Sequence, residues 1–283
     1  MKKKKEVLTK AWLIIIILFL IQLYIDGNIL EISSYNIYSD KIGESFNNTI
    51  IVQLSDLHSK EFGENNINLI SKIDDIAPDF IVMTGDMVSS KDTNFNVFLE
   101  LAKELASKYD CYYIVGNHEP DLPNNDYNYI MNSLDSYGID VLDNEKVELI
   151  KGNDKINLYG LWYNVKFYFD TDLLNVGHIE KILGEDSDDT FDLLLTHNPI
   201  YFDVYNEWGA DLTLSGHVHG GMIRLPIIGP LFAAERTLFP KYSQGEYKSE
   251  NASMIVSRGL GNGNNGFRLF NRPEINVITL KSK

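Results

Sequence analysis

Five of the six histidines in this chain of 283 residues lie in short polar segments that directly follow apolar runs. Each apolar run has the length of a buried strand. Side chains that follow parallel strands meet at the carboxyl edge of a sheet, so these segments are expected to converge on one place. The segments are Asp56-Leu57-His58, Gly85-Asp86, Gly116-Asn117-His118-Glu119, Thr196-His197-Asn198 and Gly216-His217-Val218-His219-Gly220.

Strand and helix patterns alternate along most of the chain, which predicts an α/β fold with the helices outside. Helical spacing of apolar residues predicts helices over residues 66–76, 95–108 and 127–137. Buried strands are expected over residues 49–54, 79–84, 111–115, 191–196, 211–215, 252–257 and 274–280. A hairpin is expected from residues 146–150 and 156–161 around Gly152-Asn153-Asp154. Residues 220–247 and 259–271 are expected to form loops, and a short strand is expected near residues 37–38.

The N-terminus predicts a membrane segment. Four lysines at positions 2–5 precede an apolar run over residues 11–25. Fifteen helical residues span about 22 Å, less than the roughly 30 Å of a bilayer core, and local thinning would close the gap. A cleaved signal peptide has the same layout, but no small-residue cleavage motif follows Ile25, so we favour an uncleaved anchor. A buried helix of a soluble protein fits least well.

This reading divides the chain into four parts: a basic cytoplasmic tail over residues 1–10, an anchor over 11–25, a connector over 26–48 and a catalytic domain over 49–283. The lysines are expected to stay in the cytoplasm, which places the body outside the cell in a single-pass cell-membrane protein. The net charge of −15 includes five lysines and one glutamate within residues 1–25, so the remainder carries −19. Nucleic-acid binding is not expected of such an acidic body, and the sequence names no protein partner.

Carboxylate, amide and imidazole side chains in the five segments are typical ligands of divalent Mn, Zn or Fe, and they do not form the all-oxygen site of calcium. No cysteine belongs to the set, which argues against a structural zinc site. Asp86 follows a glycine that allows close backbone approach, so Asp86 is the best placed carboxylate to bridge two ions. A lone histidine at a strand end is usually a satisfied polar residue, whereas five together favour a metal centre.

At these segments the sequence resembles the calcineurin-like metallophosphoesterase superfamily, and it is most similar to the membrane-associated bacterial YkuE/YaeI-type branch. The motifs that indicate this branch are Gly216 to Gly221, Ile223-Arg224-Leu225-Pro226, Ser257 to Gly261 and Arg268 to Glu274. The resemblance implies a four-layer αββα sandwich. It further implies hydrolysis of a phosphodiester, phosphomonoester or pyrophosphate, and with the anchor it favours a lipid-linked or cell-envelope substrate such as a UDP-diacylglucosamine-type molecule.

The resemblance also implies two divalent ions, with Mn expected first and Zn or Fe as alternatives. It assigns one ion to Asp56, His58, Asp86 and His219, and the second to Asp86, Asn117, His197 and His217. It makes His118 a catalytic imidazole near the leaving group and not a ligand. One departure is visible, because Ser89 stands where the superfamily often has a second aspartate.

Three assignments stay open in the sequence. Arg224 and Arg268 are candidates for binding substrate phosphate, and organising a loop is an equal alternative for each. The aromatic stretch over residues 162–169 is expected to pack in the core, and the alternatives are that it lines a substrate groove or sits on the membrane surface. Two other functions stay in view: a metal-binding scaffold without catalysis, and a protein phosphatase.

Overall fold

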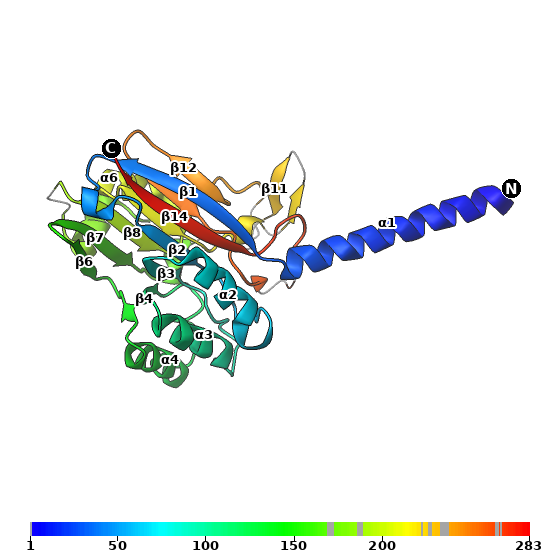
Figure 1. Ribbon diagram of the computed structural model, residues 1–283, viewed down its shortest axis with the longest axis horizontal. Coiled ribbons are helices and arrows are strands. Elements are labelled where there is room, and N and C mark those ends of the chain that lie inside the picture. Colours follow the sequence, from blue (N-terminus) through cyan, green and yellow to red (C-terminus); the bar gives the residue numbers. More distant parts are fainter. Residues whose placement is uncertain are drawn as a thin grey trace.

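Two six-stranded sheets form the centre of the molecule, and one long helix projects from it (Figure 1). The computed structural model describes residues 2–168, 173–185, 189–221, 223–225, 228–232, 238–263, 266 and 268–283. The first sheet has the order β1-β14-β2-β3-β4-β5, the second has the order β12-β13-β9-β8-β7-β6, and β10 pairs with β11 in a separate hairpin.

The strands of the first sheet are β1 (Glu31–Ser39), β2 (Ile50–Leu54), β3 (Phe80–Thr84), β4 (Asp110–Ile114), β5 (Asp140–Val141) and β14 (Glu274–Ser282). The strands of the second sheet are β6 (Lys146–Lys151), β7 (Asp154–Leu161), β8 (Phe191–Thr196), β9 (Leu212–Ser215), β12 (Gly245–Lys248) and β13 (Ser253–Val256). The hairpin consists of β10 (Ile223–Leu225) and β11 (Gly229–Phe232). The α-helices are α1 (Lys2–Asn28), α2 (Ile67–Ile76), α3 (Asn96–Ala106), α4 (Asn124–Ser136), α5 (Val176–Leu183) and α6 (Phe202–Trp208).

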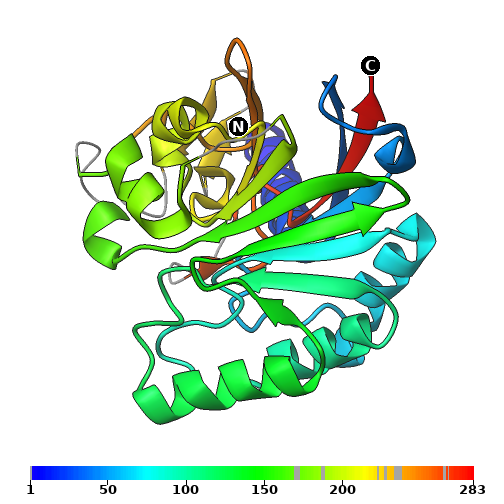
Figure 2. The same cartoon turned by 90° about the vertical axis from the view of Figure 1, so that its left-hand side faces the viewer.

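The helices cover the outer faces of the two sheets, which confirms the predicted αββα sandwich (Figure 2). Leu54 and Met83 belong to the core between the first sheet and helices α2, α3 and α4. Ile51 and Leu193 belong to the core between the two sheets. On the far side, Leu194 packs with side chains of α5 and α6. Strands buried on both faces read as continuous apolar runs, which is why the sequence identified them.

Parallel pairing brings the carboxyl ends of five strands to one edge of the sandwich. β2, β3 and β4 are parallel neighbours in the first sheet, and β8 and β9 are parallel in the second. The buried side chain of Gln53 joins the two sheets there, because its amide donates to Ser215 O at 2.9 Å and to Thr84 Oγ1 at 3.0 Å. Every segment singled out in the sequence therefore begins at this edge.

The structure corrects several expectations outside this centre. Residues 220–247, expected to form a loop, contain β10, β11 and β12. The strand expected near residues 37–38 is the nine-residue β1, which pairs in parallel with β14 at the edge of the sheet. Helices α5 and α6 were not expected, because eight and seven residues give a short periodic signal.

The N-terminal helix is longer than its apolar run. α1 covers Lys2–Asn28 and is long and apolar enough to cross a membrane, and its apolar stretch has a mean hydropathy of 2.2. The charged residues at its ends lengthen the helix but not its apolar run, so the match to a bilayer core still depends on residues 11–25. The anchor over residues 11–25 stays a prediction, and the structure adds that the helix continues beyond these residues at both ends.

Candidate metal centre

The seven expected metal ligands lie together at the carboxyl edge. Asp56 and His58 follow β2, and Asp86 follows β3. Asn117 follows β4, His197 follows β8, and His217 and His219 follow β9. Three groups of side chains have potential ligand atoms within 4.8 Å of one another: Asp56, His58 and His219; His58, Asp86 and His118; and Asp86, His197 and His217. The first and third groups fall within the two ligand sets that the family resemblance implies, and ligation itself stays a prediction.

The Asp86 carboxylate lies in the middle of the cluster. Its Oδ2 is 3.1 Å from His197 Nε2 and 3.9 Å from both His58 Nε2 and His118 Nε2. Its Oδ1 accepts a hydrogen bond from the His118 backbone N–H at 2.8 Å. Burial raises the pKa of this carboxyl group, but the surrounding imidazoles outweigh burial and hold the pKa well below its usual value. Asp86 is therefore ionised and shared between two of the three groups.

Asp56 holds the second buried carboxylate. Its Oδ2 accepts a hydrogen bond from Ser55 Oγ at 2.5 Å, and both of its oxygens lie 3.1 Å from the His217 backbone N–H. Its Oδ1 is 3.4 Å from His219 Nε2. The carboxylate of β2 is thus positioned by the loop after β9, which couples the two sheets at the site.

His58 and His219 are neutral imidazoles that face each other. Their Nε2 atoms are 3.1 Å apart and the rings stack at 4.9 Å. Burial lowers the pKa of His58 to about 4 and holds that of His219 well below its usual value. The neutral ring is the form in which histidine binds a metal.

The pKa of His197 reflects the negative charge of the carboxylates around it. Burial lowers the pKa of this imidazole, but the Asp86 and Asp56 carboxylates outweigh burial and raise the pKa to about 10. The field of the two carboxylates therefore favours a positive charge at His197 Nε2. Divalent cations bound between the two carboxylates and His197 Nε2 would supply the same positive charge.

The chemistry of the donor set fits two divalent ions. Asn117 Oδ1 is buried and has no hydrogen-bond partner among the described residues, which is the state expected of an oxygen reserved for a ligand. Asp56, His58, Asp86 and His219 would hold one ion, and Asp86, Asn117, His197 and His217 the other. Such ions would supply Lewis-acid activation of water and charge neutralisation at phosphate oxygens.

Five of the seven expected ligands have a left-handed backbone. The φ angles are 52° at Asp56, 47° at His58, 53° at Asp86, 72° at His217 and 50° at His219. Non-glycine residues rarely adopt this conformation, although aspartate and histidine tolerate it better than most, and it concentrates at functional sites. These turns change the direction of each side chain immediately after its strand, and no sequence pattern predicted them.

Glu119 is a functional residue whose role the sequence did not reveal. Its fully buried carboxylate accepts backbone N–H groups from Met87 at 2.7 Å, Gly116 at 2.8 Å and Asp86 at 3.1 Å. It therefore fixes the loops after β3 and β4 in one arrangement. Gly116 is required beside it, because a Cβ at that position would overlap with Asp86 Oδ1.

His118 differs from the other imidazoles in exposure and in hydrogen bonding. Its side chain is 12% exposed, against 3% for His58 and 5% for His219. The Ser90 backbone N–H donates to His118 Nδ1 at 3.0 Å, so a neutral ring carries its proton on Nε2. From that position Nε2–H could donate a hydrogen bond to an oxygen of a bound phosphate ester, and the catalytic role of His118 stays a prediction. Membership in the second ligand group keeps metal binding open as the alternative.

Ser89, where the family often has an aspartate, supports His58. Ser89 Oγ lies 3.1 Å from His58 Nδ1, and the Ser89 backbone N–H donates to Asp92 at 2.8 Å. The departure from the family pattern therefore retains a polar partner for this imidazole. Orientation of a ligand by such a partner is a general feature of metal sites.

The two candidate arginines both donate to backbone carbonyls of the surrounding loops. Arg268 is buried and donates to Arg258 O at 2.8 Å and Gly259 O at 3.1 Å. Arg224 Nη1 donates to Gly220 O at 2.6 Å. These contacts are the loop-organising alternative raised by the sequence. Substrate binding by Arg224 or Arg268 stays a prediction.

Within the aromatic stretch, Tyr163 and Tyr168 are buried in the core beside α5 and α6, as expected for packing. The Tyr168 ring also makes an edge contact with His217, with 4.7 Å between ring centres. The last residue of the stretch, Phe169, lies outside the described residues.

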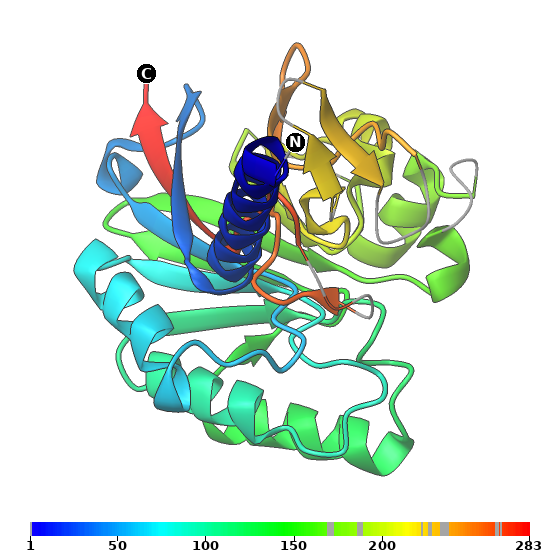
Figure 3. The ribbon, with the colours of Figure 1, turned by 90° about the vertical axis from the view of Figure 1, so that its right-hand side faces the viewer.

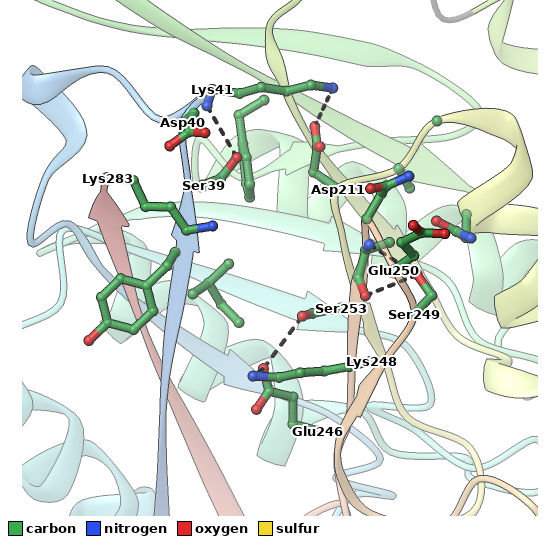
Figure 4. A pocket seen from close by; sticks show the side chains of 18 of the residues that line it. Ser39, Asp40, Lys41, Asp211, Glu246, Lys248, Ser249, Glu250, Ser253 and Lys283 are labelled. Atoms are coloured by element: carbon green, nitrogen blue, oxygen red, sulfur yellow. Dashed lines mark hydrogen bonds and ion pairs between the residues drawn. The ribbon is translucent and has the colours of Figure 1, made fainter.

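A separate cavity of about 730 Å³ opens at the opposite end of the sheets (Figure 4). Two of its three lining lysines face carboxylates: Lys41 lies 3.1 Å from Asp211, and Lys248 lies 3.1 Å from Glu246. The compensated charge distinguishes this cavity from the metal centre, where carboxylates and imidazoles converge on one another.

A buried Asp/His centre of this kind on an αββα sandwich defines a metal-dependent phosphoesterase. The family model described as calcineurin-like phosphoesterase matches residues 49–221, which is more than half of the chain. The chain therefore belongs to the calcineurin-like phosphoesterase family and is a hydrolase with an intact His/Asp site of the two-metal type.

Similar proteins cover most of the chain. The metallophosphoesterase YkuE of Bacillus subtilis is 30% identical over 267 residues, which cover 92% of this chain and 88% of that protein. The phosphodiesterase YaeI of Escherichia coli is 30% identical over 237 residues, 81% of each chain. Among solved structures, the phosphopantetheinyl hydrolase PptH of Mycobacterium tuberculosis aligns with a TM-score of 0.45 at 13% identity, covering 75% of this chain and 89% of that one.

Replacing Asp86 tests its position between the two ions. We expect Asp86→Ala to lose both metal equivalents, because this carboxylate is shared by two ligand groups. His217→Ala should lose only one equivalent, and Asp121→Ala, at an exposed position, should lose none. Metal content per chain by elemental analysis is the measurement. One equivalent retained by Asp86→Ala would show that another group bridges.

Replacing His118 separates catalysis from metal binding. We expect His118→Asn to keep two metal equivalents and to lower turnover by about 10²–10⁴-fold. The loss should be smaller for nitrophenyl substrates, whose leaving group needs little protonation. The exposed His178, replaced in the same way, is the matched control. Loss of a metal would instead make His118 a ligand, and unchanged rates with poor leaving groups would make it structural.

Proposed function

We propose that this metallophosphoesterase hydrolyses a phosphodiester, phosphomonoester or pyrophosphate bond in a lipid-linked or cell-envelope substrate at the membrane surface. The observation that carries the proposal is the attachment of α1 beside the metal centre. Asp26, near the end of α1, is 1% exposed and accepts a hydrogen bond from the Phe270 backbone N–H at 2.6 Å. The segment 259–271 that contains Phe270 also packs on Asp56, because a Cβ at Gly259 would overlap with Asp56 Cβ.

The roles of the residues follow from their placement. Asp56, Asp86, Asn117 and the ligand histidines would hold the two ions, for which Mn is the first expectation and Zn or Fe the alternatives. His118 would donate a hydrogen bond from Nε2–H to the leaving oxygen and stabilise the charge that develops there. Glu119 would keep the two loops that carry Asp86 and His118 at a fixed separation.

We place the catalytic body outside the cell and the lysines of residues 2–5 in the cytoplasm, with α1 as an uncleaved single-pass anchor. The distribution of lysines supports this orientation. A lipid pyrophosphate such as a UDP-diacylglucosamine-type molecule has a phosphate near the bilayer surface, where an anchored body would meet it. The net negative charge of the body disfavours nucleic acid as a substrate or partner.

A chelation and substrate experiment tests the reaction. Chelation of the purified full-length protein should abolish hydrolysis, and Mn should restore it, because the donor set is built for divalent ions. The substrates are nitrophenyl mono- and diesters, lipid pyrophosphates in vesicles and phosphopeptides. Preference for the vesicle substrates supports the proposal. Preference for phosphopeptides would make the protein a phosphatase of proteins, and failure on every substrate with two metals bound would leave a metal-binding scaffold.

Membrane topology is tested on intact cells. We expect the full-length protein to fractionate with membranes, and external protease to digest the body while an N-terminal tag survives. The reason is the placement of the lysines on the cytoplasmic side of α1. Amino-terminal sequencing is the control, because a mature chain that starts near residue 26 would show a cleaved signal peptide.

A further inference from the structure

Large apolar side chains are exposed on the hairpin β10–β11 and on the segments bonded to it. We call this set the apolar rim, and it consists of Ile228, Leu238, Phe239 and Phe270, which are 63%, 66%, 60% and 44% exposed. Leu238 and Phe239 belong with the hairpin, because the Phe239 backbone N–H donates to Leu231 O at 3.3 Å. Exposed apolar side chains that gather at one place indicate an interaction surface.

The apolar rim is bonded to the metal centre through a short chain of contacts. β10 begins two residues after Gly221, where the segment containing His217 and His219 ends. The Arg224 backbone N–H donates to Leu269 O at 3.0 Å, and Asn271 Nδ2 donates to His219 O at 2.7 Å. The residue between Leu269 and Asn271 is Phe270 of the rim. Phe270 of the rim therefore lies next in sequence to a residue that is hydrogen-bonded to His219.

The apolar rim is also bonded to the end of α1. Phe270 donates its N–H to the Asp26 carboxylate, and Lys60, two residues after His58, donates to Gly27 O. Arg272 donates to Ile29 O at 3.0 Å and to Leu30 O at 2.8 Å. The hairpin lies on the side of the body from which α1 leaves (Figures 1 and 3). A membrane that contains α1 therefore lies on the side of the rim.

We propose that the apolar rim docks on the surface of the bilayer that α1 spans. This contact would hold the metal centre at the level of the lipid headgroups. The inference deepens the proposed function and rests on α1 staying in the membrane. The occupant is the lipid surface, because the rim continues from the segment that enters it. The contact is apolar in kind: the part of the chain after residue 25 carries −19, so attraction to anionic headgroups would not hold it.

Probe depth tests the docking in the full-length chain. The native thiol of Cys111 is buried, so a cysteine introduced at the surface is the one that reacts with a label. Ile228→Cys reports the rim, with Phe239→Cys as a second position. Ile150→Cys is the matched control, because Ile150 is 74% exposed on β6, in the sheet edge remote from α1 (Figure 1).

Each variant carries an environment-sensitive fluorophore and is reconstituted in phosphatidylcholine vesicles. We expect a lipid-borne quencher to reduce emission at positions 228 and 239 several-fold more than at 150, and aqueous iodide to show the reverse order, at low and at high salt. Equal quenching at all three positions in a protein that floats with vesicles overturns the docking and leaves the anchor intact. A full-length protein that does not float with vesicles overturns both the docking and the proposed membrane location.

An activity ratio gives a second, independent readout. Ile228→Asp combined with Phe239→Asp should lower hydrolysis of a vesicle-embedded lipid pyrophosphate at least tenfold relative to hydrolysis of a soluble nitrophenyl ester by the same protein. An equal change in both rates, or none, overturns the docking. If wild-type protein hydrolyses the soluble ester but not the lipid pyrophosphate, the proposal of a lipid substrate is wrong. The quenching experiment then still tests the docking.

Discussion

The convergence of two buried carboxylates and several imidazoles at one sheet edge is the constraint on which the rest of the site depends. Asp56 and Asp86 are almost completely buried, and like charges this close to one another need compensation. The field they create raises the pKa of His197 to about 10, which shows how strongly the edge favours positive charge. Two divalent ions would neutralise the two carboxylates, and the neutral imidazoles of His58 and His219 would complete the donor set.

Holding this arrangement requires unusual backbone. Left-handed turns at five expected ligands cost about 1–3 kcal/mol each in ordinary surroundings, less for the aspartates and histidines found there. The strain persists because neighbouring groups over-determine it. Glu119 ties three backbone N–H groups from two loops, and Gly116 leaves space for the Asp86 carboxylate. Metal binding, which stabilises the folded state that contains the site, would offset what remains of the cost.

The parts of the molecule that were predictable from the sequence are those governed by local periodicity and strand order. β2, β3, β4, β8 and β9 are mostly apolar and buried on both faces, and the polar residues after them were expected to meet at one edge. The hairpin β10–β11 was not predicted, because strands of three and four residues that contain proline and glycine give almost no periodic signal. The role of Glu119 depends on loops that are distant in sequence, so no local pattern contains it. For Arg268, the sequence supported phosphate binding and loop organisation equally. Only the three-dimensional structure shows that its guanidinium donates to backbone carbonyl groups.

The same long-range contacts connect the anchor to the chemistry. A flexible linker between α1 and the body would leave the orientation of the metal centre free, but Asp26 is buried against the segment 259–271, and β1 begins only three residues after α1 ends. That segment contacts Asp56 on one side and the hairpin on the other. A rotation of α1 relative to the body would therefore have to break the contacts that Asp26 and Gly27 make with the body. The short connection and these contacts hold the end of α1, the base of the apolar rim and the loops of the metal centre together, so the membrane insertion proposed for α1 would also place the metal centre near the bilayer surface.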